Sequence, residues 1–187
     1  AKFIADYSPQ ILIDATMPRY PENITIDRSI APITIGLGPG YIAAEDVNYV
    51  IETKGGNYLG QVLTRGQALP ADGEPCNIQE KTTERVLRAP ADGKFKPRHK
   101  IGDVVEAGEI LGEVDGKPVK AEIKGIIRGL ISKNRKVESG LKIGDVDPRI
   151  DHKLPYTISN KARAVGGGAL EAVMYSLYRK KNQKTKA

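Results

Sequence analysis

The chain has 187 residues, enough for one sizeable core or two small ones, and its apolar content of 40% includes only 5% aromatics. The 20 glycines and 12 prolines favour short strands and turns over a helical bundle. The net charge of +6 arises mainly from five basic residues after Glu171, which argues against a nucleic-acid-binding face, and no apolar run reaches the roughly 20 residues that span a bilayer.

The first 80 residues read as a small α/β region. Residues 10–15 (QILIDA) form an apolar run typical of a buried strand, and residues 31–41 (APITIGLGPGY) predict a second strand that leads into a glycine-rich turn. Residues 48–64 predict a hairpin around a Gly-Gly-Asn loop. Residues 67–81, with two prolines and mixed polarity, predict a connecting loop at a domain boundary.

A repeat occupies the middle of the chain, within a predicted domain over residues 84–150. Residues 89–115 align without gaps on residues 121–147, with eight identities in 27 positions, where roughly one or two are expected by chance. Each copy is one unit whose apolar face needs a partner. We therefore expect two small sheets that pack face to face around a pseudo-twofold axis as a flattened barrel.

Residues 157–181 carry the strongest helix signal in the chain. Ser159 or Asn160 can cap the helix, and an apolar face repeats at helical spacing. The residues of that face are Leu170, Val173, Met174 and Leu177. Gly166, Gly167 and Gly168 interrupt the pattern, so either the helix restarts at residue 168 or a neighbouring backbone or ligand needs the room. The helix is expected to pack on the first region, followed by a basic tail over residues 182–187.

The candidate ligand-binding residues are glycines and one aspartate. Gly36, Gly38 and Gly40 follow a strand and could present backbone amides to an anion, while Asp14 ends the preceding strand. A strand-ending turn is the structural alternative. Gly166–Gly168 form a second candidate group of amides if a helix starts there, with close packing as the alternative. We expect the segments 31–41 and 160–170 to approach each other in a shared anion pocket.

Nothing in the sequence predicts a metal centre or a catalytic group. The single Cys76 and the two histidines, His99 and His152, lack metal-ligand spacing, and Cys76 cannot form an internal disulfide. No pair of carboxylates or nucleophile–base set stands at a spacing that suggests catalysis. A cytoplasmic protein without a membrane anchor is the expectation.

The duplicated segment resembles biotinyl and lipoyl carrier domains, which have the barrel-sandwich hybrid fold. The phrases that carry the resemblance are APADG, GDVVEAGEILGEV, AEIKG and KVESGLKIGDV. In that family the hairpin between the halves presents the modified lysine, and the corresponding residue is Lys117 in VDGKPVK. This hairpin is about four residues shorter than in carriers, and its flanks differ. We therefore expect Lys117 to be unmodified.

Over residues 10–178 the chain resembles the selenium-dependent molybdenum hydroxylase accessory protein family. The phrases ILIDATM, IGLGPGY, VNYVIETKGGNYLGQVL and TISNKARAVGGGALEAV follow in order. Members of that family are longer at the N-terminus, where a nucleotide-type domain is expected that these residues do not include. The resemblance implies an α+β, mainly β protein in which a duplicated biotinyl/lipoyl-like barrel-sandwich hybrid is inserted into a small α/β region with a C-terminal helix.

The resemblance also implies a function, that of a maturation factor that handles a ligand rather than an enzyme. Its partner would be a selenium-dependent molybdenum hydroxylase or the machinery that assembles its cofactor. The cargo is unknown, with a molybdopterin-type or nucleotide anion as the candidates. Two alternatives stay open: a covalent carrier domain with Lys117 as attachment site, and a structural or dimerisation module of a larger enzyme. Self-association is also left open.

Overall fold

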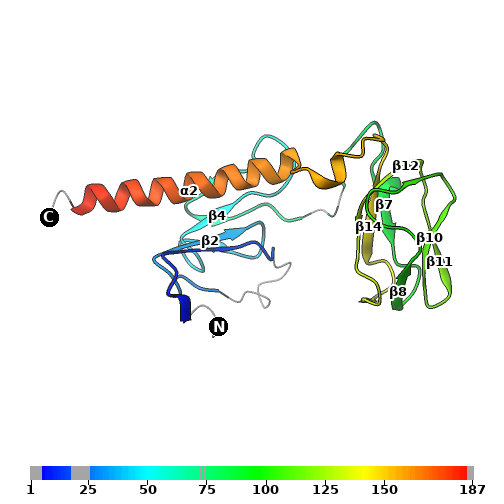
Figure 1. Cartoon of the computed structure of the whole chain (residues 1–187). Coiled ribbons are helices and arrows are strands. Elements are labelled where there is room, and N and C mark those ends of the chain that lie inside the picture. The colour runs from blue at the N-terminus through cyan, green and yellow to red at the C-terminus, as the bar shows by residue number, and fades with distance from the viewer. Residues whose placement is uncertain (1–5, 18–25, 72, 74, 185–187) are drawn as a thin grey trace. The chain divides into compact units, whose positions relative to one another are not determined.

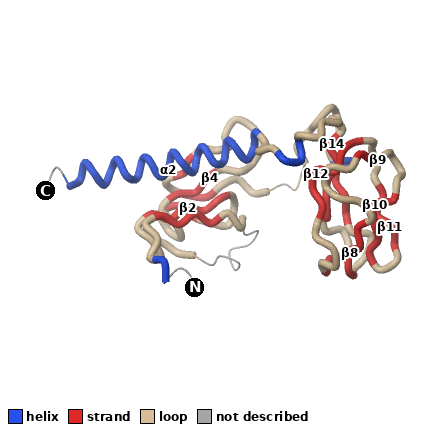
Figure 2. The backbone as a smooth tube through the Cα atoms, in the orientation of Figure 1, coloured by secondary structure: helices blue, strands red, loops and turns tan. Residues whose placement is uncertain are grey.

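The computed structural model describes residues 6–17, 26–71, 73 and 75–184; residues 185–187 of the predicted basic tail lie outside them. The protein is mainly β with one long C-terminal helix, as the predicted mainly-β α+β class requires (Figures 1 and 2). It divides into two compact units. Unit 1 combines Ala1–Asp72 with Ser159–Ala187, and unit 2 is Gly73–Ile158. The division at residue 72 falls inside the loop predicted over residues 67–81.

Unit 1 is built on a four-stranded sheet in which three strands run parallel. Its strands, in the order β1-β2-β4-β5, are β1 (Ile11–Asp14), β2 (Ile33–Leu37), β4 (Tyr49–Ile51) and β5 (Val62–Leu63). Strand β5 pairs antiparallel with β4, and the connection between them, residues 52–61, is longer than the loop predicted from Gly-Gly-Asn. A separate two-stranded ladder joins β3 (Ile42–Ala43) to β6 (Gly66–Gln67).

Both faces of this sheet are covered, because successive side chains in a strand point to opposite sides. Ile33 and Ile35 of β2 face helix α2 (Asn160–Lys184), which runs along the sheet (Figure 1). The other face is covered by the loops around β3, where Tyr41 and Val47 are fully buried. This double coverage explains why Ile33, Thr34 and Ile35 are all buried.

Helix α2 is continuous through its three glycines and is capped as predicted. The Ala162 N–H donates to Ser159 Oγ at 3.1 Å. The apolar face identified in the sequence is not the face that packs, however. Val165, Ala169 and Ala172 pack on the sheet, whereas the predicted stripe is exposed except at Val173, which is half-buried. Small residues face the sheet because the helix lies close to it.

Unit 2 consists of two four-stranded antiparallel sheets around one hydrophobic core. One sheet has the order β11-β10-β8-β13, with β11 (Lys117–Lys120), β10 (Ile110–Val114), β8 (Gly93–Pro97) and β13 (Lys136–Val137). The other has the order β7-β14-β12-β9, with β7 (Val86–Arg88), β14 (Lys142–Asp147), β12 (Gly125–Leu130) and β9 (Val104–Val105). Two 3-10 turns, η2 (Thr83–Arg85) and η3 (Leu154–Tyr156), flank them. The two sheets stay separate and do not close into a barrel.

The strand pairing in unit 2 follows the 32-residue offset of the sequence repeat. Val105 pairs with Gly125 in one sheet, and Val137 pairs with Gly93 in the other, so each half lends a short strand to the sheet of the other half. The turns obey the same relation: the Gly108 N–H donates to the Ala121 carbonyl at 2.7 Å, and the Gly140 N–H donates to the Ala89 carbonyl at 2.8 Å.

Candidate ligand-binding edge and buried ion cluster

The carboxyl ends of the three parallel strands of unit 1 bring polar residues to one edge. Asp14 ends β1, the segment from Gly38 follows β2, and Glu52 and Thr53 follow β4. Ligands of open parallel sheets commonly bind at such an edge. Asp14 lies opposite Gly36 in the parallel ladder of β1 and β2, so it is a neighbour of the glycine-rich turn.

Asp14 is held by three hydrogen bonds in a nearly buried position. The Tyr41 hydroxyl donates to Oδ2 at 2.5 Å, and the Thr16 N–H and hydroxyl donate to Oδ1 at 2.7 and 2.6 Å. Burial works to raise the pKa of Asp14, but these hydrogen bonds outweigh it and the pKa lies below its ordinary value. Burial and the Asp14 carboxylate also raise the pKa of Tyr41 far above its ordinary value. The pair is thus an ionised carboxylate locked by a neutral phenol.

The glycines of the turn have structural roles that sequence reasoning left open. A Cβ on Gly36 would clash with the Tyr41 ring and lie only 2.5 Å from its Cγ. Gly38 has a φ of +80°, and its N–H donates to the Ile51 carbonyl at 2.9 Å. Gly40 has a φ of +110°. The amide of Gly38 is therefore engaged in the fold, and anion binding by this turn stays a prediction.

Glu52 completes the edge and ties two loops to β4. It is buried, and its Oε1 accepts from the Lys54 N–H at 2.7 Å while its Oε2 accepts from the Leu69 N–H at 2.8 Å. Both carboxylates of the edge thus accept hydrogen bonds from the chain itself, and neither is placed as a free base.

The second predicted group, Gly166–Gly168, does not join this edge. These residues lie inside α2, which begins at Asn160 rather than at residue 168, so their amides belong to the helix. Segments 31–41 and 160–170 do approach, through Ile33, Ile35 and Val165, but Gly36 faces Tyr41 on the other side of the sheet. A shared pocket of both glycine groups is therefore not formed.

Close packing explains one helix glycine and leaves two unexplained. A Cβ on Gly168 would clash with the Gly60 carbonyl oxygen, and one on Gly60 would lie 2.5 Å from the Ala164 oxygen. Gly166 and Gly167, in contrast, have nothing within 4 Å of a built Cβ.

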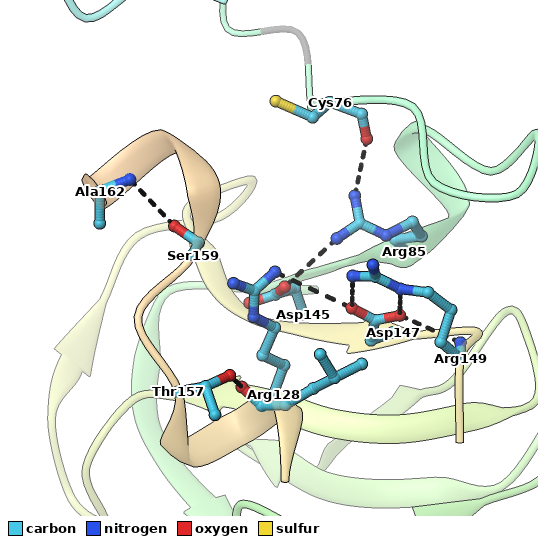
Figure 3. Close-up of polar contacts among 10 residues, drawn as sticks. Cys76, Arg85, Arg128, Asp145, Asp147, Arg149, Thr157, Ser159 and Ala162 are labelled. Atoms are coloured by element: carbon cyan, nitrogen blue, oxygen red, sulfur yellow. Dashed lines mark hydrogen bonds and ion pairs between the residues drawn. The ribbon is translucent and has the colours of Figure 1, made fainter. Parts of the chain in front are cut away.

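Unit 2 holds an ion cluster that sequence reasoning missed (Figure 3). The Asp147 carboxylate, 0% exposed, accepts from Arg149 Nε at 2.9 Å and Nη2 at 2.7 Å, and Arg128 lies 3.8 Å away. Arg85 contacts Asp145 at 3.5 Å. These residues are spread over more than 60 positions and match no motif. The pairing of β14 with β12 brings Arg128 to the cluster, and the pairing of β14 with β7 brings Arg85 to it.

Buried Arg85 anchors the loop that leads into unit 2. Its Nη1 donates to the Cys76 carbonyl at 2.8 Å, while its Nε has no hydrogen-bond partner among the described residues. Burial works to raise the pKa of Asp147, but the Arg149 hydrogen bonds and charge outweigh it and hold that pKa below its ordinary value. A carboxylate that stays ionised between guanidinium groups supports a structural lock, not acid–base chemistry.

The remaining candidates lie apart from both places. Lys117 is exposed beside a two-residue turn in which Asp115 and Gly116 have φ of +47° and +76°. Cys76 is exposed, and His99 lies between Asp103 and Glu109 at 3.6 and 3.3 Å. No cluster of three potential metal ligands occurs in the described part of the chain. Nor do the described residues contain a helix that is both long and apolar enough to cross a bilayer.

Comparison with known proteins identifies a relative but no function. A scan against protein-family models finds no match. The chain is 40% identical over 173 residues to the uncharacterized protein YqeB of Escherichia coli K12, an alignment that covers 92% of this chain and 32% of YqeB. The chain thus spans about a third of the length of this curated relative.

Two solved structures are similar to about a third of the chain. An aspartoacylase family protein of Mesorhizobium loti matches at 22% identity and a TM-score of 0.30, covering 34% of this chain and 23% of its own. A succinylglutamate desuccinylase/aspartoacylase of Rhodobacter sphaeroides matches at 25% identity and a TM-score of 0.29, covering 35% of this chain and 23% of its own. At these TM-scores neither likeness carries an argument about fold or activity.

Proposed function

We propose that this chain belongs to an accessory factor for the maturation of selenium-dependent molybdenum hydroxylases, which handles a ligand or cofactor rather than converting the hydroxylase's substrate. One observation carries the proposal. The two phrases most specific to the resemblance, VIETKGGNYLGQVL and TISNKARAVGGGALEAV, meet in the fold where Gly60 packs against Ala164 and Gly168. Two segments more than a hundred residues apart in the sequence thus pack against each other, and each requires glycine in the other at the contact.

The state of the carboxylates supports a role in handling rather than catalysis. Asp14, Glu52 and Asp147 are the buried acids of the described chain, and each accepts hydrogen bonds from neighbouring residues. A general base needs an oxygen directed at a substrate proton. The carboxyl edge of the parallel sheet, with the turn at Gly36–Gly40, is the place we propose for an anionic cargo of the molybdopterin or nucleotide type.

We also propose that unit 2 is a duplicated barrel-sandwich hybrid of the biotinyl/lipoyl type. The supporting observations are the strand exchange between halves and the glycine hydrogen bonds that recur at the offset of 32. In this reading unit 2 is a structural relative of carrier domains that has lost the attachment site.

The covalent carrier is the second candidate function, and the position of Lys117 is what favours it. The lysine is exposed and adjoins the tight turn between β10 and β11. Lys117→Arg separates the two functions, because arginine keeps the charge but cannot be lipoylated or biotinylated. The intact mass of protein from its native host is the direct check, and a mass increment at Lys117 would establish the carrier.

The accessory role is tested by deleting the gene in a selenium-using host. We expect activity of the selenium-dependent molybdenum hydroxylase to fall while selenium-independent molybdenum hydroxylases keep theirs. The wild-type gene and the Lys117→Arg gene should both restore activity. Normal activity of both enzyme classes in the deletion strain would reject the proposal, and loss of both would point to general molybdenum-cofactor supply.

A further inference from the structure

The face of α2 that points away from its sheet is apolar and uncovered within unit 1. Leu170 is 62% exposed, Met174 59% and Leu177 48%. Together with Gly167 they follow the alternating spacing of three and four residues by which one helix packs against another. We name these four residues the outer stripe. Arg163 and Lys181 continue the same spacing at its two ends.

The glycines of this face point to a partner with a rigid backbone. Gly166 and Gly167 are exposed, and nothing lies within 4 Å of a Cβ built on either, so the fold of unit 1 does not require them. Glycine inside a helix destabilises it relative to alanine. A second helix can cross closely at this point only if no side chain stands there, whereas fluid lipid chains would adapt to a side chain.

The charges at the ends of the outer stripe argue against a second copy of this chain as the partner. An antiparallel pair that matches Leu170 with Met174 of the second copy would place Arg163 beside Lys181 of that copy. A parallel pair would place Arg163 beside Arg163. Like charges at such positions disfavour association, and opposite charges favour it.

We propose that the outer stripe docks an acidic amphipathic helix of another protein. That helix would present about three turns of apolar residues, with carboxylates near both ends to meet Arg163 and Lys181, about 27 Å apart along α2. Unit 2 does not supply it, because the described residues of Gly73–Ile158 form no α-helix. The proposal is independent of the cargo and of the maturation role.

The test uses the whole 187-residue chain and a synthetic helical peptide as probe. The peptide carries leucines at heptad positions over three turns and glutamates at its ends and flanks; a control peptide replaces each glutamate with lysine. By fluorescence anisotropy at physiological salt, we expect the acidic peptide to bind at least about tenfold more tightly than the basic one. Leu170→Ser should weaken acidic-peptide binding about tenfold or more, and Tyr58→Ser, at another exposed site of unit 1, should not change it.

Gly167→Leu distinguishes a close helix–helix contact from nonspecific hydrophobic binding. Leucine is the better helix former, so the melting temperature should stay or rise, while binding of the acidic peptide should weaken about tenfold because the added side chain fills the crossing point. Equal or tighter binding by Gly167→Leu would overturn the proposal, and so would equal affinity for the two peptides. A dimer in light scattering that Leu170→Ser dissociates would assign the outer stripe to a second copy instead. Binding to phosphatidylserine vesicles that Leu170→Ser abolishes would assign it to a membrane.

Discussion

At the scale of single residues, the atoms around each glycine determine whether a side chain could replace its hydrogen. Gly36 lies against the Tyr41 ring, while Gly55 has open space around it. We expect Gly36→Ala to destabilise unit 1 by about 2 kcal/mol or more, because the Tyr41 ring must move and its hydrogen bond to Asp14 is strained. Gly55→Ala is the matched control and should change the free energy of unfolding by less than about 0.5 kcal/mol. Urea denaturation of both variants decides it; equal effects would mean that the Tyr41 ring adapts freely.

The Asp147 carboxylate should make the stability of unit 2 depend on acid pH. Its pKa is lowered in the folded state, so the unfolded chain binds the proton more readily and the stabilisation is present above the ordinary aspartate pKa of about 4. It is lost as the pH falls through the lower folded value. We expect Asp147→Asn to destabilise unit 2 by about 3 kcal/mol at pH 7, with a difference from wild type that shrinks towards pH 3.

Asp115→Asn is the control for that experiment, because the repeat places Asp115 at the position equivalent to Asp147. Asp115 is exposed in a turn with φ of +47°, a conformation that asparagine tolerates. Its variant should have nearly wild-type stability at every pH. Thermal unfolding between pH 3 and 7 measures both curves, and parallel curves for wild type and Asp147→Asn would show that the ion cluster does not set the acid response.

At the scale of elements, helix α2 contains neighbouring glycines with opposite roles. Gly168→Ala should destabilise unit 1 by about 2 kcal/mol or more, because the new Cβ meets the Gly60 carbonyl and the helix must shift from β4. Gly166→Ala should stabilise the same helix by about 1 kcal/mol, since its Cβ meets nothing. Chemical denaturation of the two variants gives the sign of each effect; stabilisation by Gly168→Ala would contradict the packing described at Gly60.

The elements also show what the sequence could and could not reveal. The 32-residue spacing of the repeat recurs in the strand pairing of unit 2, but the flattened barrel predicted from it does not close. Periodicity located the apolar stripe of α2 but not the face that packs. Val165, Ala169 and Ala172 also recur at helical spacing, but their small side chains give a weaker apolar signal than Leu170, Met174 and Leu177. The Asp14–Tyr41 contact was within reach, because Asp14 ends β1 and Tyr41 follows β2, the parallel neighbour of β1. The Arg85–Asp145 contact was not, because no local pattern links residues so far apart.

At the scale of the whole molecule, the two units have separate hydrophobic cores. The core of unit 2 contains Phe95 and Leu111, and the cores of unit 1 contain Ile35 and Tyr41. We expect residues 75–158, expressed alone, to fold with the dispersed amide spectrum of a β domain, and heteronuclear NMR checks this. In the whole chain, Asp147→Asn should lower the unfolding transition of unit 2 without moving that of unit 1. A single transition that shifts as a whole would show that the units unfold together.

The discontinuity of unit 1 has a consequence for the order of events during protein synthesis. Val165 follows Ile51 by 114 residues, yet both belong to one core. At ribosomal rates of about 5–20 residues per second, the sheet emerges roughly 10 s before the helix that covers it. Unit 2, whose residues are contiguous, can fold during that interval. The apolar face of the sheet is therefore exposed on the nascent chain until α2 is synthesised. We expect the protein to depend most on chaperones during this interval.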